Sequence, residues 1–246
     1  MAVSTAIGTI VSNANYISRP FAAARHSLSG EMDFSPGILV RGTWLAEQVQ
    51  ISWSDELYDP PTEVTEEADE AIAQLARRGS PSHDGLSTRL AAFRASAGEL
   101  HLDLQPIRWS LRLTSDACQS LAAMCAVRSA DGRWLAGHRA EWLASWPGRW
   151  ALGAGGSPDP GEHPVDTLRR ELHEEWSVAP EHLSVEALLC LEQRLVLFLG
   201  LAWLPANATV SADDEHSGYA WWPPDPESWP PEADGAVREM GLMLAS

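Results

Sequence analysis

The spacing of apolar and polar residues predicts a chain of strands with three helices. Residues 99–104 (ELHLDL) alternate strictly, which is typical of a strand with one buried face. Residues 194–204 (RLVLFLGLAWL) are almost continuously apolar, as in a strand covered on both faces. Asp131-Gly132 is the strongest short hairpin signal. The other expected elements are strands within 38–53, 86–93, 121–129, 133–140, 150–154, 185–192 and 219–222, and helices at 65–78, 164–176 and 232–244.

Residues 164–176 show a clear helical period. Pro164 suits the first helical position, where its missing N–H costs nothing. One apolar stripe contains Val165, Leu168, Leu172 and Trp176, and a separate carboxylate ridge contains Glu171, Glu174 and Glu175. Carboxylates at this spacing repel each other, and a hard cation with oxygen ligands removes that cost, which suggests Mg²⁺ or Mn²⁺. The alternative is an ordinary solvated acidic face.

The segment that contains this helix, 155–178, reads GGSPDPGEHPVDTLRRELHEEWSV. It resembles the Nudix box, G-x5-E-x7-R-E-U-x-E-E-x-G-U with U apolar, and departs from it only at Ser177, which stands in place of the last glycine. Glycine suits that position because a helix often ends on a left-handed residue, where a side chain costs about 1 kcal/mol. The resemblance implies a metal-dependent hydrolase that cuts a diphosphate linked to a nucleoside.

The resemblance also implies roles for individual residues. The implied metal ligands are Glu171, Glu174, Glu175 and the carbonyl of Gly155, with Glu162 as an outer ligand. Arg170 is expected to pair with a box carboxylate and fix its rotamer, the alternative being a purely structural ion pair. The general base is either a box glutamate or an acid from a later loop, where Glu215 is our choice. The expected catalytic residues are Glu171, Glu174, Arg170 and Glu215.

Two residues between the strands are candidates for substrate binding. Arg139, beside His138 at the end of a predicted strand, is a candidate for contact with substrate phosphates, and an exposed strand-end pair is the alternative. Trp146 lies in a Trp-Pro-Gly loop and offers a flat face for a nucleobase. Core packing is the more common fate of such an aromatic residue.

The length of 246 residues leaves more than a hundred in front of the box. Trp53, a predicted helix, HDGLSTRLAAF (83–93) and GELHLDL (98–104) resemble the region that precedes the box in the UDP-glucose diphosphatase branch of the family. We therefore expect a leader at 1–35 that is poorly ordered, a smaller α+β section at 36–106 and a Nudix domain at 107–246. The expected fold class is α/β, an α/β/α sandwich with a mixed sheet.

Composition and charge exclude several classes. The net charge is −17, all 17 basic residues are arginine and no basic stripe is visible, so nucleic acid is not expected as a partner. No apolar run approaches 18 residues and the N-terminus lacks a positive region before its apolar stretch, so we expect no membrane span, no secretory signal and a cytoplasmic location. The three cysteines, Cys118, Cys125 and Cys190, are expected to be buried reduced thiols.

Three functions follow from these patterns. The first is hydrolysis of a nucleoside diphosphate linked to another moiety, as in a nucleotide sugar or ADP-ribose, with Mg²⁺ or Mn²⁺ as cofactor. The alternatives are a nucleoside triphosphate pyrophosphatase that removes damaged nucleotides, and a catalytically silent module that senses a nucleotide. A homodimer is compatible with the sugar-diphosphate branch, but no residue in the sequence demonstrates one.

Overall fold

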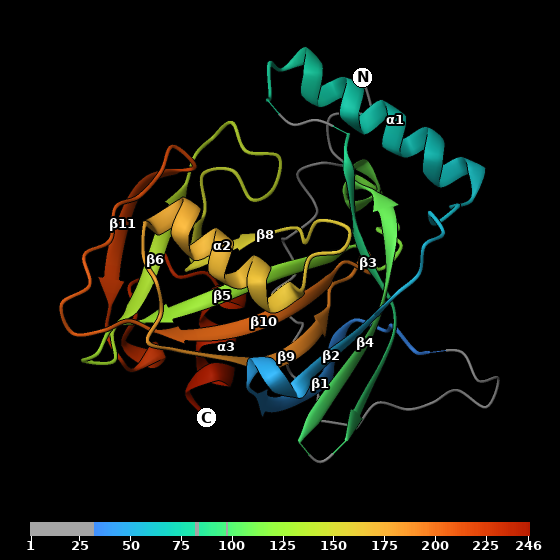
Figure 1. Ribbon diagram of the computed structural model, residues 1–246. Coiled ribbons are helices and arrows are strands. Elements are labelled where there is room, and N and C mark those ends of the chain that lie inside the picture. The colour runs from blue at the N-terminus through green and yellow to red at the C-terminus, as the bar shows by residue number, and fades with distance from the viewer. Residues whose placement is uncertain (1–31, 82–83, 97) are drawn as a thin grey trace.

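The computed structural model describes residues 32–81, 84–96 and 98–246 (Figure 1). The expected leader at 1–35 lies almost entirely outside these residues. In the described part of the chain, no helix is long and apolar enough to span a membrane.

The larger sheet contains parallel and antiparallel strands and lies between helices α2 (Pro164–Trp176) and α3 (Gly235–Ala245). Among the described residues it has eight strands: six run in the order β1-β9-β10-β5-β6-β11, β7 pairs with β6, and β8 pairs with β5. β10 is parallel to β5, whereas the remaining pairs are antiparallel. The strands are β1 (Gly37–Trp44), β5 (Leu121–Arg128), β6 (Trp134–Arg139), β7 (Trp150–Leu152), β8 (Ala154–Gly156), β9 (His182–Cys190), β10 (Val196–Trp203) and β11 (His216–Trp222).

A helix covers each face of this sheet. α2 (Pro164–Trp176) crosses one face and buries the predicted apolar stripe, while α3 (Gly235–Ala245) lies behind the sheet (Figure 1). β5 serves both layers because its side chains alternate: Ala123 and Cys125 pack in the core under α2, and Ala122 packs in the core under α3. The predicted α/β/α sandwich is confirmed.

Residues between β1 and β5 form a second, three-stranded sheet in the order β2-β4-β3. Its strands are β2 (Val49–Trp53), β3 (Leu86–Ser96) and β4 (Glu99–Arg108), and α1 (Thr62–Arg77) and the 3-10 turns η1 (Ala46–Gln48) and η2 (Trp109–Leu113) accompany it. α1 begins three residues earlier than the predicted Thr65, directly after Pro61. β1 pairs with β9 in the larger sheet, so the expected division at 106/107 does not separate the two sheets. That division stays a prediction.

Gly153 redirects the chain between β7 and β8. β7 pairs with β6, whereas β8, one residue later, pairs with β5. Gly153 adopts φ +59, and a Cβ there would lie 1.8 Å from the carbonyl oxygen of Cys125, so only glycine fits. The predicted single strand at 150–154 is therefore two short strands, and the second of them delivers Gly155-Gly156 beside α2.

Candidate functional site

The ends of α2 are fixed by local chemistry. The ring of His163 accepts a hydrogen bond from the backbone N–H of Val165, and Pro164 follows as the first helical residue. At the other end Ser177 adopts φ 55 and ψ 36, the left-handed conformation expected where the family motif has glycine. The substitution therefore keeps the helix end and leaves the glutamates on its last two turns.

Arg170 gathers three of the expected site carboxylates. Its Nη1 lies 2.7 Å from Glu171 Oε1 and 3.0 Å from Glu174 Oε2, and its Nε lies 3.0 Å from Glu162 Oε1. The pKa of Glu162 is below its usual range despite the desolvating effect of burial, because Arg170 and the Asp159 N–H donate to that carboxylate. The predicted pairing of Arg170 with a box carboxylate is present, and it extends to Glu162.

Glu175 is separated from this group and is buried under it. Its Oε1 accepts a hydrogen bond of 2.8 Å from the Gly155 N–H, and its Oε2 has no hydrogen-bond partner. Burial raises the pKa of Glu175 to about 9. His216 lies against the same carboxylate, with Nε2 3.6 Å from Oε2, and its ring packs on Trp176. The ridge predicted from the sequence is therefore one exposed glutamate, Glu174, beside two that point into the protein.

The turn before the box is shaped to admit Glu171. A Cβ at Gly156 would lie 1.9 Å from Glu171 Oε1, so the close approach of strand and carboxylate requires glycine. Burial raises the pKa of Glu171, and the guanidinium of Arg170 opposes that shift. Two box glutamates, Glu171 and Glu175, thus have raised pKa values within one small volume, which is typical of functional carboxylates.

Glu215 joins this group from the loop before β11. Burial raises its pKa, the nearby Arg139 opposes the shift, and the charges of Asp213 and Glu174 add to it. Arg139 Nη2 lies 3.9 Å from Glu215 Oε2, at the long end of an ion pair. The structure therefore brings Glu215 and Arg139 to the box, while its role as a base stays a prediction.

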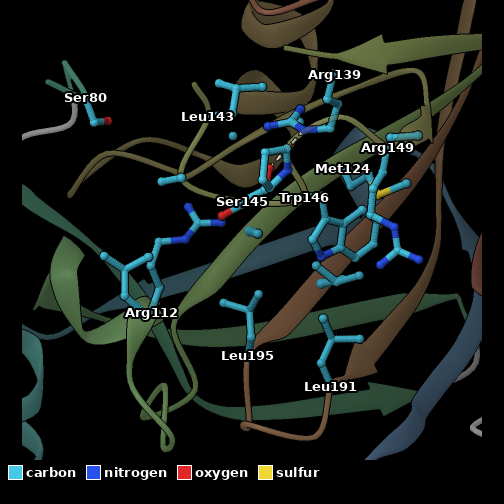
Figure 2. Close-up of a pocket in the computed structure, with 18 of the residues that line it drawn as sticks. Ser80, Arg112, Met124, Arg139, Leu143, Ser145, Trp146, Arg149, Leu191 and Leu195 are labelled. Atoms are coloured by element: carbon cyan, nitrogen blue, oxygen red, sulfur yellow. Dashed lines mark hydrogen bonds between the residues drawn. The ribbon is translucent and has the colours of Figure 1, made fainter. Parts of the chain in front are cut away.

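A cavity of about 740 Å³ opens beside these residues. Gly153, Ala154, Gly155 and Gly156 form the part of its wall nearest the box. Figure 2 shows Arg112, Arg139 and Trp146 reaching the cavity from different segments of the chain. Trp146 is half-buried and lines this cavity. It does not pack in the core, although core packing is the more common environment for such a residue.

The donor atoms of this site are suited to a divalent cation. Its donors are carboxylate oxygens, which Mg²⁺ and Mn²⁺ prefer, and Glu175 Oε2 is a buried oxygen without a partner. Across residues 32–81, 84–96 and 98–246, no three acidic, histidine or cysteine side chains are already grouped to hold a metal ion. Nη1 of Arg170 contacts both Glu171 and Glu174, at 2.7 Å and 3.0 Å.

Two residues at the site were missed by sequence reasoning. His216 belongs to the Asp-Asp-Glu-His run that contains Glu215, but nothing local shows that it contacts Glu175. Arg112 lies in η2, in the unremarkable stretch WSLRL, and contacts Ser157 of the box loop 45 residues away. Neither contact has a signal in the sequence pattern, because both depend on how the sheets pack.

Comparison with known proteins identifies the domain. Residues 119–240 match the family model of the NUDIX domain. Nucleoside triphosphatase NudI of Escherichia fergusonii is 28% identical over 114 residues, which are 41% of this chain and 80% of that protein. NudI of Escherichia coli is 29% identical over 115 residues, 42% of this chain and 81% of that protein.

Solved structures of the same family are also similar to this chain. A MutT NUDIX hydrolase from Burkholderia pseudomallei is 22% identical, with a TM-score of 0.43, over 51% of this chain and 97% of that chain. An Ap4A hydrolase from C. elegans, solved as a binary complex, is 24% identical, with a TM-score of 0.39, over 50% of this chain and 92% of that chain. The family model and the relatives agree with the box geometry: residues 119–240 of this chain are a Nudix domain, a member of the Nudix hydrolase family.

Proposed function

We propose that this protein hydrolyses the pyrophosphate bond of a nucleoside diphosphate linked to another moiety, as in a nucleotide sugar or ADP-ribose. The proposal rests above all on Glu175, whose Oε1 accepts a hydrogen bond from the N–H of the cavity-lining Gly155 and whose Oε2 is buried without a partner. Nudix hydrolases in general use divalent metals such as Mg²⁺. A cytoplasmic location and the UDP-glucose branch remain predictions from the sequence.

Glu171, Glu174 and Glu175, with the carbonyl of Gly155, are the residues that would hold the metal, and Glu162 is the outer ligand. When bound, Mg²⁺ or Mn²⁺ would neutralise charge on the phosphate oxygens and polarise the attacking water. Arg170 orients Glu171 and Glu174 through its two contacts and keeps their mutual repulsion low.

Residues around the cavity are the proposed groups for proton transfer and for orienting the substrate. Glu215 is the proposed base: its raised pKa makes it a better proton acceptor than an ordinary surface carboxylate. Arg139, which lies 3.9 Å from Glu215, is the proposed contact for a phosphate, and the cavity-lining Trp146 is the proposed stacking partner of the nucleobase. The substrate would then span from the tryptophan to the box.

A nucleoside triphosphate is the second candidate substrate. The relatives named nucleoside triphosphatase, at 28% and 29% identity, favour it. The same carboxylates would serve, since either substrate presents a phosphoric anhydride to them. The two candidates differ in products: a nucleoside diphosphate sugar releases a nucleoside monophosphate and a sugar phosphate, whereas a triphosphate releases a monophosphate and pyrophosphate.

A substrate panel with Mg²⁺ or Mn²⁺ tests the proposal. It contains UDP-glucose, GDP-mannose, ADP-ribose and damaged and normal nucleoside triphosphates, and the products are separated by chromatography. Glu174→Gln should lower kcat by about a hundredfold or more while the fold is retained, because the side chain is 54% exposed. Glu181→Gln, an exposed glutamate between α2 and β9, is the matched control. Equal turnover by wild type and Glu174→Gln rules out the site, and tight binding without turnover supports the sensing module instead.

A further inference from the structure

The cavity has the opposite charge balance from the chain as a whole. The sequence contains 34 acidic residues and 17 arginines. The cavity is lined by four arginines, Arg78, Arg112, Arg139 and Arg149, and by one carboxylate, Glu141. A concentration of guanidinium groups in so acidic a protein indicates a site for an anion.

Two of these arginines differ in how well they are neutralised. Arg149 is held 2.5 Å from Asp234 in a close ion pair, so its charge is already compensated. Arg112 has no carboxylate within ion-pair distance among the described residues, and its side chain donates instead to the neutral Ser157 Oγ, at 2.6 Å. A half-buried cation without an anion is costly. Its position therefore calls for a negatively charged ligand.

The electrostatic surroundings of Arg112 agree with this geometry. Burial and, to a smaller extent, the positive charge of Arg139 lower the pKa of Arg112 to about 10, while Glu171 opposes the shift. Two guanidinium groups that repel one another across a cavity would both be stabilised by one anion between them. Arg139 itself has only the 3.9 Å contact with Glu215.

Ser157 connects Arg112 to the box. The hydroxyl of Ser157 accepts from Arg112, and its carbonyl accepts from Arg170 Nη2 at 3.3 Å. An anion bound by Arg112 would therefore lie beside the loop that follows Gly156, next to the carboxylates that are the proposed metal ligands. A phosphate fits this place, because a guanidinium presents a planar fork of donors to phosphate oxygens.

We propose that Arg112 binds a phosphate of the nucleotide together with Arg139, so that the segment before the Nudix domain supplies part of the substrate site. Arg112 lies in η2, ahead of the residues 119–240 that match the family model. α1 lines the same cavity through Ala71, Gln74 and Leu75. The proposal rests on the proposed function for the identity of the ligand as a nucleotide, but the anion site itself is testable without hydrolysis.

Binding of inorganic pyrophosphate in metal-free buffer, measured by calorimetry and tryptophan fluorescence, tests the site. Arg112→Gln should weaken pyrophosphate binding by about tenfold or more, and Arg112→Lys, which keeps the charge but loses the fork, by a smaller factor. Arg133→Gln, on the exposed β5–β6 turn, is the matched control and should bind as wild type does. Adenosine, which has no phosphate, should bind equally to all variants that fold.

The outcomes separate this proposal from the proposed function. Unchanged pyrophosphate affinity in Arg112→Gln, or in Arg112→Lys if the glutamine variant does not fold, overturns the anion site even if the enzyme hydrolyses nucleotides. An absence of pyrophosphate binding to the wild type overturns it as well. Equal loss of adenosine and pyrophosphate binding shows a structural role and also contradicts the proposal. If the wild type hydrolyses no nucleotide but binds pyrophosphate, and Arg112→Gln loses that binding, the proposed function fails and the anion site stands.

Discussion

His216 lies against Glu175 as a neutral ring beside a neutral carboxyl group. Their atoms Nε2 and Oε2 are 3.6 Å apart, within ion-pair distance, and both side chains are almost fully buried. Burial nevertheless lowers the pKa of His216 and raises that of Glu175, so both shifts favour uncharged forms. The contact is therefore a buried polar pair in which Glu175 keeps its proton at neutral pH, and not a salt bridge.

The stability of the metal-free protein should fall as the pH rises from 7 to 9. The pKa of Glu175 is about 9 in the folded state and about 4.3 in the unfolded state. Its contribution to the free energy of unfolding is therefore largest below about pH 4.3 and is lost as the pH rises to about 9. Burial lowers the pKa of His216 in the folded state below its unfolded value of about 6.5. His216 is therefore neutral in both states between pH 7 and 9 and does not change the free energy of unfolding there.

Urea denaturation in EDTA at pH 7, 8 and 9 measures this effect. Wild type should lose about 2 kcal/mol more than Glu175→Gln between pH 7 and 9. Glu174→Gln, with its exposed side chain, is the matched control for removing a box carboxylate. Parallel pH profiles for wild type and Glu175→Gln would show that Glu175 is ionised in the folded protein at neutral pH.

Metal binding should release a proton from the same group. A carboxylate must be ionised to act as a ligand, so the apparent affinity for Mn²⁺ should rise by up to about tenfold per pH unit between 7 and 9. Calorimetry in two buffers of different ionisation enthalpy counts the protons released per ion, and about one is expected for wild type at pH 7. Glu175→Gln should bind the ion more weakly and without this pH dependence. Affinity that is independent of pH in wild type would remove Glu175 from the ligand set.

The box helix illustrates what could be predicted from the sequence. Its start at Pro164, its end at Trp176 and its buried stripe all follow from local rules of capping and periodicity, and the structure confirms them. Ser177 was expected in a left-handed conformation for the same reason, and it has φ 55. Local chemistry sufficed because each of these features depends on residues within one or two turns.

Features that depend on packing between distant segments could not be predicted. At Gly153 the chain stops pairing with β6 and starts pairing with β5, and this change depends on the carbonyl of Cys125. β1 joins the larger sheet by pairing with β9, far along the chain. Likewise, the burial of Glu175 depends on Gly155 and His216, which approach from opposite directions along the chain. Helical periodicity placed the three glutamates on one ridge, but only the fold decides which of them meets solvent.

Replacement of Ser177 by glycine should stabilise the protein. The left-handed conformation costs a residue with a side chain about 1 kcal/mol, and glycine avoids that cost but loses more backbone entropy on folding. Ser177→Gly should therefore raise the free energy of unfolding by about 0.5 kcal/mol in urea denaturation, with kcat unchanged. Ser177→Ala retains a Cβ and should give no gain. A gain in both variants would mean that the serine hydroxyl, and not the backbone conformation, is unfavourable there.

Replacement of Gly156 by alanine should remove activity while the fold is retained. The added Cβ would lie 1.9 Å from Glu171 Oε1 and 2.4 Å from its carboxyl carbon, which are the far end of a flexible side chain. Glu171 can swing away at little cost to the backbone, but it then leaves both Arg170 and the proposed metal site. We expect kcat to fall by about a hundredfold, with a change in unfolding free energy below about 1 kcal/mol. Gly218→Ala, where a Cβ meets no atom within 4 Å, is the matched control and should keep full activity. Full activity in Gly156→Ala would show that the position of Glu171 seen here is not the one used in hydrolysis.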